Sequence, residues 1–142
     1  MLKLMRAFFP SVLVAYIAAV ALGTWGVLDH VASFGVPVSF NDRIAAIWHD
    51  LMGMVGSYLP LMCIALLIAL WAGQWSQRRW QLPRPYWLTL AGFVAVVALL
   101  SIMEIVLGLQ GIAAARTLSG LIGQGLAGAL GGFLFARLTT AS

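Results

Sequence analysis

The side chains of this sequence that could do chemistry are few, and we expect five of them near one face of a membrane. These candidates for binding a ligand or an ion are Arg43, His49, Asp50, Glu104 and Arg116. Carboxylates, an imidazole and guanidinium groups could together hold an ion, pass protons or act on a lipid-like substrate. The simpler alternative is that they mark the membrane boundary and tie helix ends together. No nucleotide-binding, hydrolase or metalloprotease motif occurs that would indicate one reaction.

Glu104 is expected to lie below the outer membrane surface. If Trp87 marks the inner interface, Glu104 lies about 25 Å farther along a helix, inside a hydrocarbon core about 30 Å thick. A carboxylate at that depth is costly unless it is paired or hydrated. Arg116 is expected at about the same level. We therefore predict an ion pair between Glu104 and Arg116, which Asp50 could join.

The second group of candidates is a glycine pattern near the C-terminus. Six glycines lie between residues 118 and 136. Small residues let transmembrane helices approach closely, so such a pattern indicates a helix-association face. That face could pack inside the chain, against other copies or a larger membrane protein, or it could line a pore. Its expected residues are Gly120, Gln124, Gly125, Gly128 and Gly132.

Two histidines, His30 and His49, are the candidates for holding a metal or a haem. A b-type haem is often held by two histidines on facing helices, and both residues are expected on the outward side. Two histidines alone are not a ligand cluster, so we expect no metal and no cofactor. Haem b and a histidine–carboxylate metal site are the alternatives. The single cysteine, Cys63, excludes a disulfide within the chain.

The composition places these residues in a lipid bilayer. Hydrophobic residues make up 63% of the 142-residue chain and charged residues 8%, whereas soluble domains carry about 25% charged residues. Four apolar runs are long enough to cross a hydrocarbon core. We predict an all-α integral membrane protein, one domain over 1–142, folded as an antiparallel bundle of four transmembrane helices. The expected helices are 7–28, 44–72 (kinked at Pro60), 87–109 and 118–136.

The basic residues indicate the orientation of these helices. Only Arg43 and Arg116 fall on one side, and six basic residues fall on the other: Lys3, Arg6, Arg78, Arg79, Arg84 and Arg137. The positive-inside rule then places both termini in the cytoplasm, and the small size suggests a bacterial-type inner membrane. Because orientation explains the net charge of +4, we expect no nucleic-acid partner.

Three functions follow as expectations. The first is an interaction or accessory subunit of the inner membrane, which packs through the glycine-rich helix 118–136 as a homo-oligomer or against a larger membrane protein. The second is a small oligomeric channel or transporter with an outward-side polar site. The third is a membrane-embedded enzyme acting on a lipid-like substrate, and enzymatic activity is the less expected class.

Overall fold

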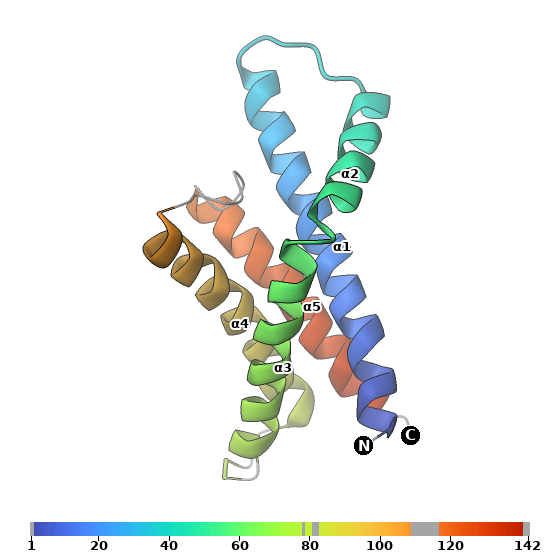
Figure 1. Ribbon diagram of the computed structural model, residues 1–142, viewed down its shortest axis with the longest axis vertical. Helices are drawn as coiled ribbons and strands as arrows, with labels where there is room; N and C mark the ends of the chain where they lie inside the picture. The colour runs from blue at the N-terminus through green and yellow to red at the C-terminus, as the bar shows by residue number, and fades with distance from the viewer. Residues whose placement is uncertain (1, 78, 81–82, 109–116, 141–142) are drawn as a thin grey trace.

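The computed structural model describes residues 2–77, 79–80, 83–108 and 117–140, and no strand occurs among them (Figure 1). Four of its helices are long and apolar enough to cross a membrane, namely α1, α3, α4 and α5. This confirms the predicted all-helical membrane fold, and the contacts among the helices are consistent with a bundle. The five helices are α1 (Leu2–Ser33), α2 (Phe40–Met54), α3 (Tyr58–Gln77), α4 (Arg84–Leu107) and α5 (Leu118–Thr140).

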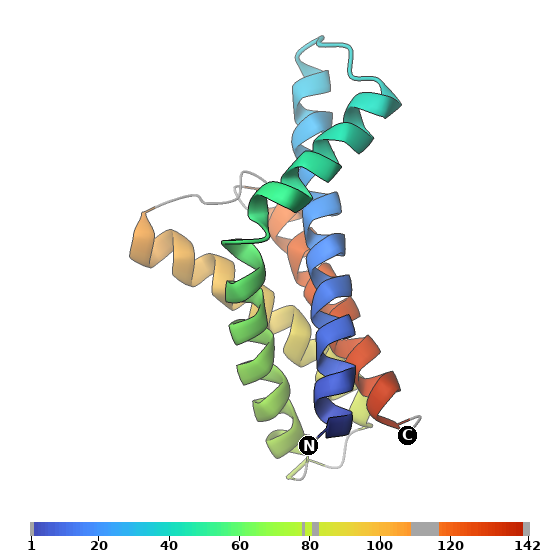
Figure 2. The same ribbon diagram turned by 45° about the vertical axis from the view of Figure 1, so that its right-hand side comes forward.

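The helices alternate in direction, as Figures 1 and 2 show. Helix α1 runs up, α2 and α3 run back down one after the other, α4 runs up and α5 runs down. The start of α1 and the end of α5 therefore lie at the same end of the bundle. Helix α1 has 32 residues, so it is about 48 Å long, which is longer than a hydrocarbon core of about 30 Å is thick. Its last turns form a hairpin with α2 that projects beyond α4 and α5 (Figure 1).

The structure corrects one predicted element, the continuous helix over 44–72. Helix α2 ends at Met54 and α3 begins at Tyr58, with Ser57 N–H donating to the Met54 carbonyl at 3.2 Å. The break therefore precedes Pro60, where the kink was expected. Pro60 lies in the first turn of α3, where its missing N–H has no helical acceptor in any case. Gly53 lies in the last turn of α2 and Gly56 in the break itself, and glycine is a weak helix former.

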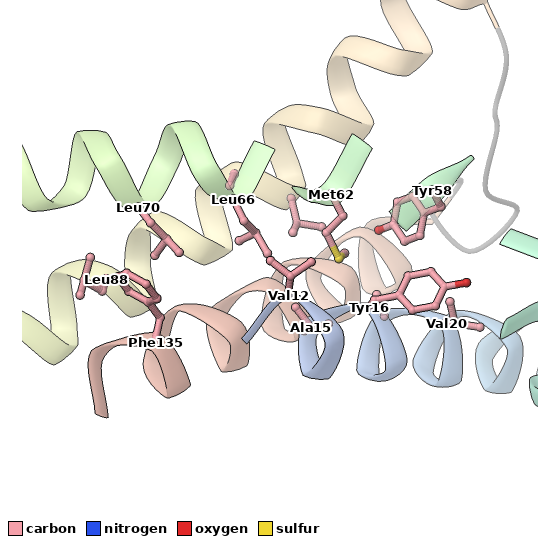
Figure 3. Close-up of a cluster of buried hydrophobic side chains, with 14 of the residues drawn as sticks. Val12, Ala15, Tyr16, Val20, Tyr58, Met62, Leu66, Leu70, Leu88 and Phe135 are labelled. Carbon is pink, nitrogen blue, oxygen red and sulfur yellow. The ribbon is translucent and has the colours of Figure 1, made fainter. Parts of the chain in front are cut away.

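The core is formed where α3 meets the other three spanning helices (Figure 3). Its largest members are fully enclosed, including Met62 and Leu66 of α3 and Leu88 of α4. Phe135 of α5 and Val12 of α1 belong to the same buried cluster. Along α3 this cluster continues from Tyr58 to Leu70, toward the end of the bundle that holds the two chain ends (Figure 1).

Helix α5 packs closely against α4 through its glycines. A Cβ atom on Gly92 would overlap the carbonyl oxygen of Gly128, and one on Gly132 would overlap that of Leu88. Only glycine allows the two backbones to approach this closely. The Gly128–Gly132 pair is therefore used inside the chain, which was one of the alternatives for the glycine pattern.

Candidate functional site: a polar chamber at the α2–α3 break

A chamber of about 210 Å³ lies where α2 breaks into α3. Helix α1 supplies one wall with Thr24, and α2 supplies Asp50. Tyr58 at the start of α3 and Gln124 on α5 complete its polar lining. Four helices thus bring a carboxylate, an alcohol, a phenol and an amide to one partly open hollow, whose remaining walls are mostly apolar.

Of the residues that the structure describes, only Asp50 brings a charge to the lining of this chamber. The buried hydroxyl of Thr24 donates to Asp50 Oδ2 at 2.7 Å, which ties α2 to α1. The second oxygen, Oδ1, lies 3.8 Å from His49 Nδ1. The Asp50 side chain is 37% exposed and that of His49 is 89% exposed. Among the described residues, no arginine or lysine forms an ion pair with this carboxylate.

Tyr58 and Gln124 are hydrogen-bonded to each other in the lining. Tyr58 Oη donates to Gln124 Oε1 at 3.2 Å, and Gln124 Nε2 donates to the Ala19 carbonyl at 2.8 Å. Gln124 is only 1% exposed. A buried amide is tolerated in an apolar bundle only when such partners replace water. Gln124 therefore ties α5 to both α1 and α3.

Tyr16 stabilises the break that positions the chamber. Its hydroxyl donates to the Leu51 carbonyl at 2.6 Å. Leu51 is one of the last four residues of α2, whose carbonyl groups have no N–H donor within the helix. The Tyr16 hydroxyl supplies a donor to the Leu51 carbonyl. The Tyr16 and Tyr58 rings lie side by side with their centroids 6.2 Å apart (Figure 3).

The structure separates Arg43 from Asp50. Arg43 Nη1 lies 2.7 Å from Asp29 Oδ1, and its guanidinium carbon lies 4.7 Å from the centre of the Trp25 ring. Arg43 therefore joins α2 to α1 within the projecting hairpin and does not line the chamber. His49 points away from the bundle with its side chain almost fully exposed.

The predicted Glu104–Arg116 pair remains a prediction, because Arg116 lies outside the described residues. Glu104 is exposed near the end of α4 and does not line the chamber. His30 packs edge-on against Phe34, with ring centroids 5.1 Å apart. Within the described ranges, no three histidine, cysteine, aspartate or glutamate side chains form a group that could hold a metal ion. The haem interpretation of His30 and His49 also stays a prediction.

The other glycines of α5, of which Gly120 and Gly125 were predicted association residues, differ in their surroundings. A Cβ on Gly125 would lie 2.6 Å from the Phe93 ring of α4, and one on Gly131 would lie 2.8 Å from the Ala15 Cβ of α1. Gly120 N–H donates to Thr117 Oγ1 at 3.1 Å and so helps to begin the helix. By contrast, a Cβ on Gly123 would meet nothing within 4 Å.

Sequence reasoning missed Thr24, Tyr16 and Tyr58. Each is a lone hydroxyl in an apolar stretch, and such hydroxyls usually bond their own helix backbone. Ser11 does so, donating to the Ala7 carbonyl at 2.7 Å. A usable signal was the position of Tyr58 directly after Gly56 and Ser57, where a helix break leaves backbone groups without partners.

A second hollow, which we call the α3–α4 groove, opens between those two helices. It has a volume of about 570 Å³ and is lined almost entirely by apolar side chains. It extends from Leu61 to Ser76 along α3, a distance of about 22 Å. Large side chains such as Ile64, Ile68 and Val94 are exposed along it.

Neither a known protein family, nor a curated protein, nor a solved structure matches this chain.

Proposed function

We propose that the protein is an interaction or accessory subunit of an inner membrane, and that its α3–α4 groove binds a transmembrane helix of another protein or another copy. The observation that carries this proposal is the groove itself. Of the described helices, none fills it, although it is long, apolar and open.

The groove has the lining that helix association in lipid requires. Small residues lie on both of its sides, with Ala65 and Ala69 on α3 and Ala91, Ala95 and Ala98 on α4. Because lipid tails are as apolar as leucine, helices associate in a bilayer through close packing rather than through the hydrophobic effect. Small side chains on both walls leave room for the side chains of an incoming helix to interdigitate.

The shape of the groove supports a helix as its occupant. At its inner end α3 and α4 are in contact, since a Cβ on Gly73 would lie 3.2 Å from the Ala91 Cβ. Toward the outer end α4 leans away from α3, as Figure 2 shows. A helix crossing at a moderate angle would fill a hollow that widens in this way.

This proposal transfers the association surface from α5 to α3 and α4. Of the α5 glycines that suggested association, Gly125, Gly128 and Gly132 are packed against α4 of the same chain. The outward face of α5 instead carries large exposed side chains such as Leu126 and Leu130. Large apolar side chains of this kind are typical of a helix face that contacts lipid.

We place the start of α1 and the end of α5 on the cytoplasmic side as part of the proposal. Arg84 begins α4 and Arg137 lies in the last turn of α5, both at that end of the bundle. Exposed tryptophans, Trp71 and Trp75 of α3, lie near the same level. Basic residues with interfacial aromatic residues are typical of the cytoplasmic face of an inner membrane.

Photo-crosslinking in native membranes tests the groove. A photoreactive residue is placed at Val94 in the groove or, as a matched control, at Leu126 on α5; the two native side chains are 55% and 53% exposed. We expect a discrete protein adduct from position 94 and mainly lipid adducts from position 126. An adduct near twice 15.2 kDa indicates another copy, and any other discrete mass indicates a different protein. Lipid adducts alone at position 94 would contradict the proposal.

The second candidate function is a small channel or transporter, and the chamber at the α2–α3 break favours it. Transporters commonly place their sites where a helix is interrupted. Below Gln124, however, Met62, Leu66 and Phe135 fill the bundle (Figure 3). A path across the membrane would therefore need an oligomer or a rearrangement of this core.

A further inference from the structure

We propose that the chamber at the α2–α3 break is a binding site for a small organic ammonium ion, with Asp50 as its charge partner. This inference is independent of the α3–α4 groove, because the two hollows share none of their described lining residues.

The charge of the chamber favours a cation. Within the described ranges, Asp50 is its only charged lining residue. The nearest guanidinium of the hairpin, Arg43, is bound to Asp29 at 2.7 Å. A carboxylate near the membrane boundary is costly unless it is paired or hydrated. An anion would be repelled by Asp50, whereas a cation would supply the counter-charge that the described residues do not.

One oxygen of the carboxylate is fixed and the other is available. Thr24 donates to Oδ2 at 2.7 Å and so holds the orientation of the side chain. His49 Nδ1 lies 3.8 Å from Oδ1, which is beyond hydrogen-bond distance. An ammonium N–H can therefore donate to Oδ1 without displacing an existing hydrogen bond.

The size and lining of the chamber favour an organic cation over a metal ion. Hard metal ions take about six to eight oxygen ligands at close range. The described lining offers four polar side chains, and these are already joined in two hydrogen-bonded pairs. Val20, Val27, Leu28 and Met54 form much of the wall. At about 210 Å³ the chamber is smaller than the sites of drug-sized ligands. An ammonium head with a short apolar body matches both features.

The site is reached from the side opposite the chain ends. Thr24 is eighteen residues beyond Arg6 on the straight helix α1, or about 27 Å along it. Asp50 therefore lies close to the outer boundary of a hydrocarbon core about 30 Å thick. Its partial exposure provides access, and the surrounding low dielectric strengthens its attraction for a cation.

Binding of alkylammonium ions to the purified full chain in lipid nanodiscs tests the proposal. The probes run from methylammonium to hexylammonium, each compared with the neutral alcohol of the same length by calorimetry. We expect one site per chain, an optimum at a short or intermediate chain length, and binding at least about tenfold tighter than that of the alcohol. Failure of every alkylammonium ion to bind, or equal binding of the alcohols, would overturn the proposal.

Two pairs of variants locate the site. Asp50→Asn removes the charge and should weaken binding about tenfold or more, whereas Glu104→Gln removes an exposed acid of α4 and should leave binding unchanged. Ala46→Leu fills the chamber and keeps the carboxylate, and Ala45→Leu makes the same change at its exposed neighbour. Ala46→Leu should abolish binding and Ala45→Leu should not.

These pairs keep the proposal falsifiable if one variant misfolds. Should Asp50→Asn lose its helical circular dichroism, the comparison of Ala46→Leu with Ala45→Leu still decides whether the chamber is the site. Equal binding by both alanine variants would place the ammonium elsewhere and contradict the proposal. Photo-crosslinking at Val94 is unaffected by either outcome, so the two proposals fail separately.

Discussion

At the scale of single residues, the buried side chain of Gln124 is important for the stability of the fold. It is buried and bonded to Tyr58 and to the Ala19 carbonyl. Gln124→Leu leaves the Tyr58 hydroxyl without its acceptor, and we expect it to lower the free energy of unfolding by about 1–2 kcal/mol. Tyr58→Phe should cost less, about 0.6 kcal/mol, because interhelical hydrogen bonds in membranes average about that. Denaturation in mixed micelles measures both.

The double variant provides the control for this prediction. If the hydrogen bond joins the two side chains, Gln124→Leu with Tyr58→Phe should cost less than the sum of the single changes. Gln74→Leu is the matched exchange at a residue whose amide bonds its own helix, at the Leu70 carbonyl, and it should have little effect. Strictly additive costs would contradict the observed pairing.

The candidate site could be predicted only in part, and the reason lies in particular residues. Asp50 stood out because a carboxylate near an apolar helix is rare. Its partner Thr24 lies twenty-six positions away on another helix. Helical periodicity states which residues of one helix share a face, but it does not state which helices are neighbours. The same limit explains why Arg43 was grouped with Asp50 although it binds Asp29.

At the scale of elements, the start of α2 is stabilised by a capping box. The Ser39 hydroxyl accepts from Asp42 N–H at 3.2 Å, and Ser39 N–H donates to Asp42 Oδ2 at 3.0 Å. Hydrogen bonds from the Ser39 side chain and backbone lower the pKa of Asp42 from its ordinary value of 3.8. A lowered pKa means that the stabilisation is present above about pH 3.8 and is lost as the pH falls through the lower folded value.

This gives an acid-dependent prediction for α2. As the pH falls below 3.8, protonation of Asp42 should fray the first turn of α2 while the spanning helices persist. NMR chemical shifts of the Ser39–Arg43 backbone follow this change. Ser39→Ala removes the side-chain hydrogen bond and should move the midpoint toward higher pH. A midpoint that does not move in Ser39→Ala would show that the capping box does not control it.

The packing of α5 against α4 gives a prediction with an internal control. Gly132→Ala would place a methyl group against the Leu88 carbonyl, whereas Gly123→Ala meets nothing within 4 Å. Because overpacking at a close contact costs about 1–3 kcal/mol, Gly132→Ala should destabilise the fold by about that amount. Gly123→Ala should be neutral or slightly stabilising, since alanine is the better helix former. Thermal unfolding that is equal in the two variants would contradict the observed packing.

The spanning helices could be predicted because length and apolar content identify them directly. The break between α2 and α3 could not, since Gly53, Gly56 and Pro60 all offered a place for it. The structure places it at Val55–Ser57, where Tyr16 from α1 bonds the freed Leu51 carbonyl. This stabilisation comes from another helix, which a local pattern cannot reveal.

At the scale of the whole molecule, the chamber and the α3–α4 groove depend on the angles at which the helices cross. Helix α5 packs tightly along α1 and α4 through its glycines, whereas α4 leans away from α3 toward the end of the bundle opposite the two termini (Figure 2). The sequence has small residues, glycine or alanine, in the segments of α3, α4 and α5 alike. Which rows close within the chain and which stay open depends on crossing angles that no single helix determines. The α3–α4 groove was therefore visible only in the assembled bundle.

Native mass spectrometry from a mild detergent tests the interaction proposal most directly. The groove predicts a discrete complex, with either a second copy or one other protein, for the wild-type chain of 15.2 kDa. Ala98→Leu, which fills the open part of the groove, should release the monomer, and Gly123→Leu on the outward side of α5 should retain the complex. A wild-type chain that is found only as a monomer with bound lipid, or a complex that persists in Ala98→Leu, would contradict the groove as the association surface.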